Sequence, residues 1–215
     1  MNPVETEKRQ MSEKSLPRSA QDLALKEARQ LMERLDDEPS HALQVRRLAL
    51  DLYDQLTPLH GYGKEERLLL ECASLLHDIG WSIKPNAHNK GARDAILAEP
   101  FVGLDDRQRL IVALVARYHR KSHPHSRHRG YRDLRMDDRR IVRVLASILR
   151  IADGLDRSHT ENIRQIDCDY SDGQLRLRFV PRGDPSMELF GLRKKLRLFE
   201  EEFGMAVWGE PVREL

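Results

Sequence analysis

Apolar residues recur every three or four positions along most of the first 155 residues, and this pattern constrains the fold more than any other feature. A period of 3.6 residues places such side chains on one face of a helix. Breaks such as Pro39, Pro58 and Gly80 separate the stripes. We therefore expect a mainly α-helical bundle, with helices near 23–35, 39–58, 65–77, 88–98, 105–119 and 137–155.

The pattern changes after residue 160. Residues 163–170 and 175–181 are typical of strands, and Asp172-Gly173 between them predicts a hairpin turn. A helix over 189–203 and a strand over 205–208 complete a small α+β (ββαβ-like) subdomain. The predicted organisation is a flexible leader over 1–20, a helical domain over 21–160 and this tail over 161–215. We expect the tail to form a lid or a homodimer surface.

Composition excludes several classes of protein. No segment approaches 18 consecutive apolar residues, and the first residues lack an apolar signal-peptide segment. Cys72 and Cys168 lie far apart in unlike contexts, which excludes a disulfide framework. These features predict a cytoplasmic protein that does not act at a membrane.

The formal net charge of +2 conceals a strongly basic segment. Residues 105–160 contain 14 Lys and Arg against 7 Asp and Glu. This segment is either a solvated face or a surface that binds polyanions. Nucleic-acid binding is disfavoured, because the arginines lack interleaved aromatic residues and no recognition-helix motif is present.

Within that segment, residues 121–136 predict a loop rich in histidine and arginine. His123, His125 and His128 leave three interpretations open: a zinc site, a flap that contacts polyanions, or a plain solvated loop. Their spacing matches no familiar zinc pattern and no cysteine assists, so the flap is favoured.

His77-Asp78 ends an apolar helix and is followed at once by Ile79 and Gly80. An imidazole and a carboxylate buried there are costly unless something binds them, and a divalent metal would do so. The alternative is a histidine bonded to the backbone beside a capping aspartate. His41 on an upstream stripe and Asp153 in the most apolar helix favour the metal, because such side chains can converge inside a helical bundle.

The order His41, His77-Asp78, Asp153 resembles the HD superfamily of metal-dependent phosphohydrolases, which are helical bundles. The segments SLLHDIGW, RYHRK and LRIADGLDRS make the chain from about residue 38 to its C-terminus similar to the C-terminal region of the exopolyphosphatase/guanosine pentaphosphate phosphatase (Ppx/GppA) family. The resemblance implies an HD-type bundle followed by a small α/β part. It does not include the family's actin-like catalytic half, so the exopolyphosphatase activity of that half is not assigned to this chain.

The resemblance also implies a ligand set. His41, His77, Asp78 and Asp153 match the core metal ligands, and His88 and His119 match further histidines of metal-rich members. One or two divalent ions are expected, with Mn, Fe, Co, Ni, Zn and Mg not distinguished, and Asp78 would bridge two ions. The second histidine of a familiar His-X-X-His pair is missing after His88, which weakens the case for the second ion.

The expected function is hydrolysis of a phosphate ester or phosphoanhydride by a metal-activated water, with His77 and Asp78 as catalytic residues. The substrate would be a phosphorylated small molecule, namely a nucleotide, an alarmone or a polyphosphate-like chain. The alternative is a non-catalytic or regulatory module that binds the same polyanions. Guanidinium and ammonium groups suit phosphate, and the candidate contacts are Arg117, Arg120, Lys121, Arg150 and Arg157.

Overall fold

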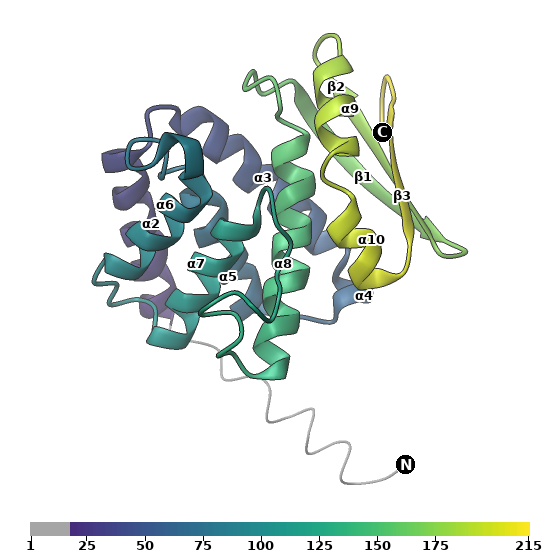
Figure 1. Ribbon diagram of the computed structural model, residues 1–215. Helices are drawn as coiled ribbons and strands as arrows, with labels where there is room; N and C mark the ends of the chain where they lie inside the picture. Colours follow the sequence, from purple (N-terminus) through teal and green to yellow (C-terminus); the bar gives the residue numbers. More distant parts are fainter. Residues whose placement is uncertain (1–17) are drawn as a thin grey trace, which may run out of the picture.

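The computed structural model describes residues 18–215 and shows a helical bundle joined to a small mixed sheet (Figure 1). Residues 1–17 of the expected leader lie outside the described residues. Residues 18–20 belong to the first helix, which therefore begins before the expected residue 23. The bundle comprises α2 (Arg18–Leu35), α3 (Pro39–Gln55), α4 (Thr57–His60), α5 (Lys64–Leu76), η1 (Pro85–Ala87), α6 (His88–Ala98), α7 (Asp106–Tyr118) and α8 (Met136–Gly154).

Helix α8 lies at the centre of the molecule, between α5, α6 and α7 and the helices of the C-terminal part, while α3 also contacts the first C-terminal strand directly (Figure 1). Helix α8 packs against α3, α5 and α7 on one side. Most of its residues from Ile141 to Gly154 are buried, as its apolar stripe predicted. Within the described part of the chain, no helix is long and apolar enough to cross a membrane.

The C-terminal part contains three strands in the order β1 (Ile163–Ser171), β2 (Gln174–Pro181) and β3 (Ala206–Pro211). Strands β1 and β2 are antiparallel and meet at the predicted Asp172-Gly173 turn, where both residues have positive φ. Strand β3 runs parallel to β2, which requires a crossover connection. The intervening helical segment supplies that connection and lies between α8 and the sheet (Figure 1).

That segment is two helices, α9 (Ser186–Arg193) and α10 (Arg197–Phe203), instead of the single predicted helix over 189–203. No proline or glycine marks the break, and the apolar spacing continues through it, so periodicity could not reveal it. The turn directs Lys195 toward the bundle, where its Nζ donates to the backbone carbonyl of His119. The tail is therefore packed on the bundle as part of one structure.

Two glycines allow neighbouring segments to approach closely beside the candidate site. A Cβ on Gly80 would lie 1.9 Å from the carbonyl oxygen of His88, so the turn after α5 rests directly on the start of α6. A Cβ on Gly191 would lie 2.4 Å from the carbonyl oxygen of Gly154. These contacts hold α6 against the end of α5, and α9 against the end of α8.

Candidate metal centre

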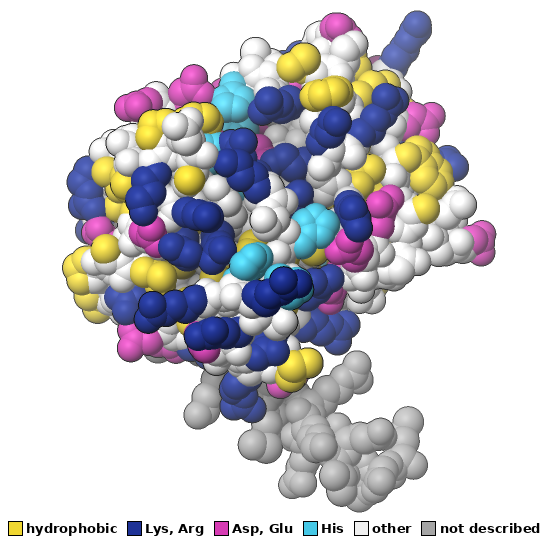
Figure 2. All heavy atoms as spheres, in the orientation of Figure 1, with side chains coloured by type: hydrophobic (Ala, Val, Ile, Leu, Met, Phe, Trp, Pro, Cys, Tyr) yellow, Lys and Arg dark blue, Asp and Glu magenta, His cyan; other side chains and the backbone are white. Residues whose placement is uncertain are grey.

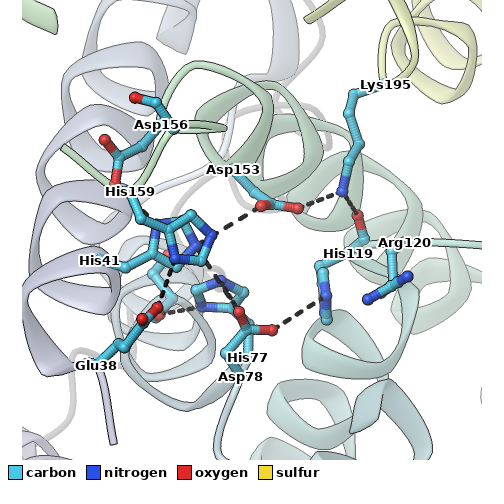
Figure 3. A network of polar contacts seen from close by, with 12 residues as sticks. Glu38, His41, His77, Asp78, His119, Arg120, Asp153, Asp156, His159 and Lys195 are labelled. Atoms are coloured by element: carbon cyan, nitrogen blue, oxygen red, sulfur yellow. Dashed lines mark hydrogen bonds and ion pairs between the residues drawn. The ribbon is translucent and has the colours of Figure 1, made fainter. Parts of the chain in front are cut away.

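The six metal-ligand candidates come from helix ends that meet at one place. His41 is in the first turn of α3, His77 and Asp78 follow α5, and His88 begins α6. His119 follows α7, and Asp153 is in the last turn of α8. Each of the six residues is at most 9% exposed. Figure 3 shows five of them, from four segments, pointing toward one another. They are His41, His77, Asp78, His119 and Asp153.

The six side chains form two groups that can each hold a metal ion. His41, His77 and Asp153 make the first group, and Asp78, His88 and His119 make the second. Within each group, one ligand atom per residue lies within 4.8 Å of the others. Neutral imidazole nitrogen and carboxylate oxygen are common ligands of divalent transition metals, so both donor sets suit such an ion.

Asp78 faces both groups. Its Oδ2 lies 3.8 Å from Nε2 of His41 and 3.7 Å from Nε2 of His77. Its Oδ1 lies 3.3 Å from Nε2 of His88 and 3.4 Å from Nε2 of His119. Because each oxygen is directed at a different pair of histidines, the carboxylate has the placement needed to bridge two ions.

Hydrogen bonds orient three of the imidazoles. Nδ1 of His41 donates to Oδ2 of buried Asp156 at 2.8 Å, and Nδ1 of His77 donates to the carbonyl of Ser74 at 2.8 Å. Nδ1 of His119 donates to the carbonyl of Ala116 at 2.6 Å. Because these acceptors hold the Nδ1 side of each ring, each Nε2 is directed at the centre, which is how partners around a metal site orient its histidines.

Several of the inward-facing atoms have no protein partner. Nε2 of His41, Nε2 of His77 and Oδ1 of Asp78 are fully buried and make no hydrogen bond with any described residue. Buried polar atoms without partners are costly in a folded protein. A divalent ion would satisfy these atoms, so the residues fit the expected metal.

Lys195 holds the outer oxygen of Asp153. Oδ1 of Asp153 lies 3.8 Å from Nε2 of His41, while Oδ2 accepts a hydrogen bond from Nζ of Lys195 (Figure 3). Burial alone would raise the pKa of Asp153, but the Lys195 ammonium and the neighbouring histidines hold that pKa well below its usual range. Asp153 is therefore ionised, with one oxygen directed at the other residues of the first group.

The pKa values of the second group suit metal binding at neutral pH. Burial lowers the pKa of His88 to about 4 and that of His119 well below its usual value, although the Asp78 charge opposes both shifts. Burial would raise the pKa of Asp78, but His77 and His119 lower it to about 2. At pH 7 the two histidines are neutral and the carboxylate is ionised, as ligation requires.

A protein-family model described as Ppx/GppA phosphatase, domain III, matches residues 25–182 of the chain. The match covers nearly three quarters of the 215 residues and contains all six ligand candidates. The chain belongs to the Ppx/GppA domain III family. In a sequence comparison, no curated protein matches it. The family match ends at the close of β2, so α9, α10 and β3 of this Ppx/GppA domain III chain lie beyond the matched segment.

In this Ppx/GppA domain III chain, which lacks the second histidine of the His-X-X-His pair, a cation contacts His88. Nη1 of Arg120 lies 2.7 Å from Nε2 of His88, the nitrogen that would ligate an ion of the second group. Asn89 stands next to His88, and its side chain donates to the carbonyl of Arg117. The second group therefore binds an ion only if Arg120 gives up its contact with His88, whereas no such cation contacts the imidazoles of the first group among the described residues.

A cavity of about 360 Å³ is lined by the whole second group and by Asp153 of the first, together with several cationic side chains. Figure 2 shows Lys and Arg side chains gathered across one face of the molecule, with histidines among them. Arg150 is buried and its Nη1 donates to the carbonyl of Tyr118, so its position in the wall is fixed. The cations that line the cavity are Arg120, Lys121, Arg150, Arg157, Lys194 and Lys195.

Arg117 is the one expected phosphate contact that does not line this cavity. Its guanidinium lies 5.2 Å from the centroid of the Tyr118 ring. Arg117 and Arg120 are three residues apart, but α7 ends at Tyr118, so helical geometry no longer places them on one face.

The histidine-rich loop does not form a metal site. Nδ1 of His128 pairs with the hydroxyl of Tyr118 at 2.9 Å, and Nδ1 of His123 pairs with Glu201 at 3.0 Å. Neither of the two candidate metal groups found in residues 18–215 includes a histidine of this loop. The zinc interpretation of residues 121–136 is therefore not supported.

Sequence reasoning missed three residues that support the centre. Asp156 lies three positions after Asp153 but beyond the end of α8 at Gly154, so helical spacing does not signal its role. The ring of His159 stacks on that of His41 with centroids 3.8 Å apart, and its Nδ1 donates to Glu38. Lys195 lies 42 residues after Asp153. No local pattern signals it.

Proposed function

We propose that this Ppx/GppA domain III chain is a metal-dependent phosphohydrolase. It would cleave a phosphate ester or phosphoanhydride of a nucleotide, an alarmone or a polyphosphate-like chain. The observation that carries the proposal is the division of the Asp78 oxygens between two groups of buried histidines, beneath a cavity lined by cations. Nε2 of His41, Nε2 of His77 and Oδ1 of Asp78 lack protein partners, and a bound metal would supply them.

Divalent ions held there would supply Lewis acidity and lower the pKa of water. The chain's own residues account for the rest of the site. Asp78 and Asp153 provide negative charge at the base of the cavity, and the Nδ1–H bonds of the histidines keep their Nε2 atoms aimed inward. Arg120, Lys121 and Arg157 face the same space and would neutralise the phosphoryl oxygens, which is the main electrostatic requirement of phosphoryl transfer.

A second candidate function is a regulatory module that binds phosphorylated ligands without turnover. The contact of Arg120 with Nε2 of His88 favours it, because a guanidinium at that nitrogen competes with an ion of the second group. The same cations would then retain a polyanion on a site that lacks the full metal complement.

Metal content and phosphate release distinguish the two functions. The purified chain is loaded separately with manganese, cobalt, nickel and magnesium, its bound metal is measured by elemental analysis, and it is incubated with nucleotides and polyphosphates. Hydrolysis by the loaded wild type supports the first function. Bound polyanion without phosphate release under any of these metals overturns the first function and supports the second.

The matched variants are Asp78→Asn and Asp137→Asn. Asp78→Asn removes the charge that faces both groups, so it should lose both ions and all phosphate release while keeping its helical circular dichroism. Asp137 is exposed in the first turn of α8, and its variant should retain both properties. Full metal retention by Asp78→Asn would contradict the assignment of the centre.

A further inference from the structure

Two exposed aromatic side chains line the same cavity as the cations and the metal-ligand candidates. Trp81 is 47% exposed and lies in the turn after Asp78, and Phe190 is 53% exposed and lies on α9. They come from segments more than 100 residues apart. Large aromatic side chains are costly to leave in water, so their presence in one cavity points to a ligand that covers them.

Each ring lies beside groups already assigned to the site. The Trp81 ring centroid is 4.1 Å from that of His88, with the planes tilted by 32°. Nζ of Lys194 is 5.3 Å from the centroid of the Phe190 ring. The cavity thus combines carboxylates and histidines, phosphate-binding cations and two aromatic surfaces. An inorganic polyphosphate would use the first two and leave both rings in water.

The backbone fixes Phe190 in this position. Its neighbour Gly191 packs closely on Gly154 and Arg157. A Cβ added to Gly191 would lie 2.4 Å from the carbonyl oxygen of Gly154 and 2.7 Å from Cβ of Arg157. Helix α9 therefore cannot slide along α8 without losing this contact. It also lies beyond the residues that match the family, so Phe190 belongs to the part of the wall that the family match does not include.

We propose that Trp81 and Phe190 are specificity-determining residues that contact the base of a nucleotide substrate, while the cations of the cavity contact its phosphates. Every nucleobase has a π-face that stacks on aromatic side chains, and a cation near a ring reinforces such contacts. The cavity of about 360 Å³ is within the range of small-molecule sites. This inference rests on the proposed function, since it assigns two residues that would select among the substrates of that site.

The test compares two kinds of probe that differ by a nucleoside: methylenediphosphonate itself, and adenosine 5′-(α,β-methylene)diphosphate with its guanosine counterpart. Neither is hydrolysed at its methylene bridge, so binding to the manganese-loaded protein is measured by calorimetry without turnover at that bond. We expect at least one nucleoside probe to bind on the order of tenfold more tightly than methylenediphosphonate. Phe190→Ala and Trp81→Ala should each remove most of that advantage, while the affinity for methylenediphosphonate stays within about twofold.

Met187→Ala is the matched control. Met187 is 51% exposed on the same helix and does not line the cavity, so its variant should bind both probes like the wild type. A second readout uses Trp208→Phe, which leaves Trp81 as the remaining tryptophan of the chain. Its fluorescence should change with the nucleoside probe and not with methylenediphosphonate.

Equal affinities for all probes, or an equal loss of affinity for all probes in Phe190→Ala, would overturn the inference and favour a polyphosphate-like substrate. The phosphohydrolase proposal would survive that result. It fails instead if the wild type binds no metal or releases no phosphate, and neither measurement depends on Phe190 or Trp81.

Discussion

Replacing Lys195 by methionine removes the ammonium that pairs with Asp153 and leaves a side chain of similar length. The side chains of Lys195 and Asp153 are only 16% and 12% exposed. Once Lys195 is replaced, solvent therefore screens the unpaired charge of Asp153 poorly. Removing one partner of a buried ion pair costs about 3–5 kcal/mol. Since both groups retain slight exposure, we expect about 3 kcal/mol in the metal-free protein, or a fall in Tm of roughly 6–12 °C for a chain of this size.

Metal should rescue much of this loss. An ion in the first group would neutralise Asp153 in place of Lys195, so the variant should lose less stability in manganese than in EDTA. By linkage, manganese then raises the Tm of the Lys195→Met variant more than it raises that of the wild type.

The assay is thermal unfolding followed by circular dichroism, in EDTA and in saturating manganese. Lys194→Met is the control, because Lys194 is exposed and makes no ion pair with the described residues. Its Tm should change by no more than about 2–4 °C, as for surface substitutions worth under 1 kcal/mol. If Lys195→Met lowers Tm by the same amount in EDTA and in manganese, the proposed charge compensation of Asp153 is refuted. Lys195 would then stabilise the protein by packing alone.

Three further predictions concern the same region. Burial lowers the pKa of His88 from 6.5 to about 4 in the folded chain, so the unfolded chain binds this proton at a higher pH. The free energy of unfolding of the metal-free protein, measured in urea, should therefore fall as the pH falls from 6.5 to 4. His88→Gln should weaken this dependence of stability on pH. Gly191→Ala should cost about 1–3 kcal/mol because its Cβ would overlap Gly154, whereas Gly183→Ala, whose Cβ would meet nothing within 3.4 Å, should unfold like the wild type. Arg157→Gln should weaken methylenediphosphonate binding by about tenfold in calorimetry with no change in Tm, because a charge-assisted contact is lost from the cavity wall.

Helix positions were largely predictable because they depend on local periodicity. The stripe over 137–155 corresponds to α8 at Met136–Gly154, and the stripe over 105–119 corresponds to α7 at Asp106–Tyr118. The break within 189–203 was not predictable, because no proline lies there, Gly191 lies within α9 and not at the break, and α9 and α10 both pack on α8. Turn chemistry was equally local, as the Asp172-Gly173 hairpin shows.

Part of the centre was also readable from the chain. His77, Asp78 and Asp153 stand out because charged or polar groups interrupt apolar helices, which is costly without a partner. His88 and His119 carry no such signal and were implied by the family resemblance. Trp81 and Phe190 carried none either, because an aromatic residue in a helical sequence is more often part of the core than of a cavity wall.

The sequence by itself determined the helices, the hairpin and the residue types available for a metal centre, since each depends on neighbours within a few positions. Only the tertiary structure decided which atoms face one another. It directed each oxygen of Asp78 at a different pair of histidines, brought Lys195 to Asp153 and left Arg117 outside the cavity. These relations join segments that are distant in the chain, and they arise only when helices pack at particular angles and depths.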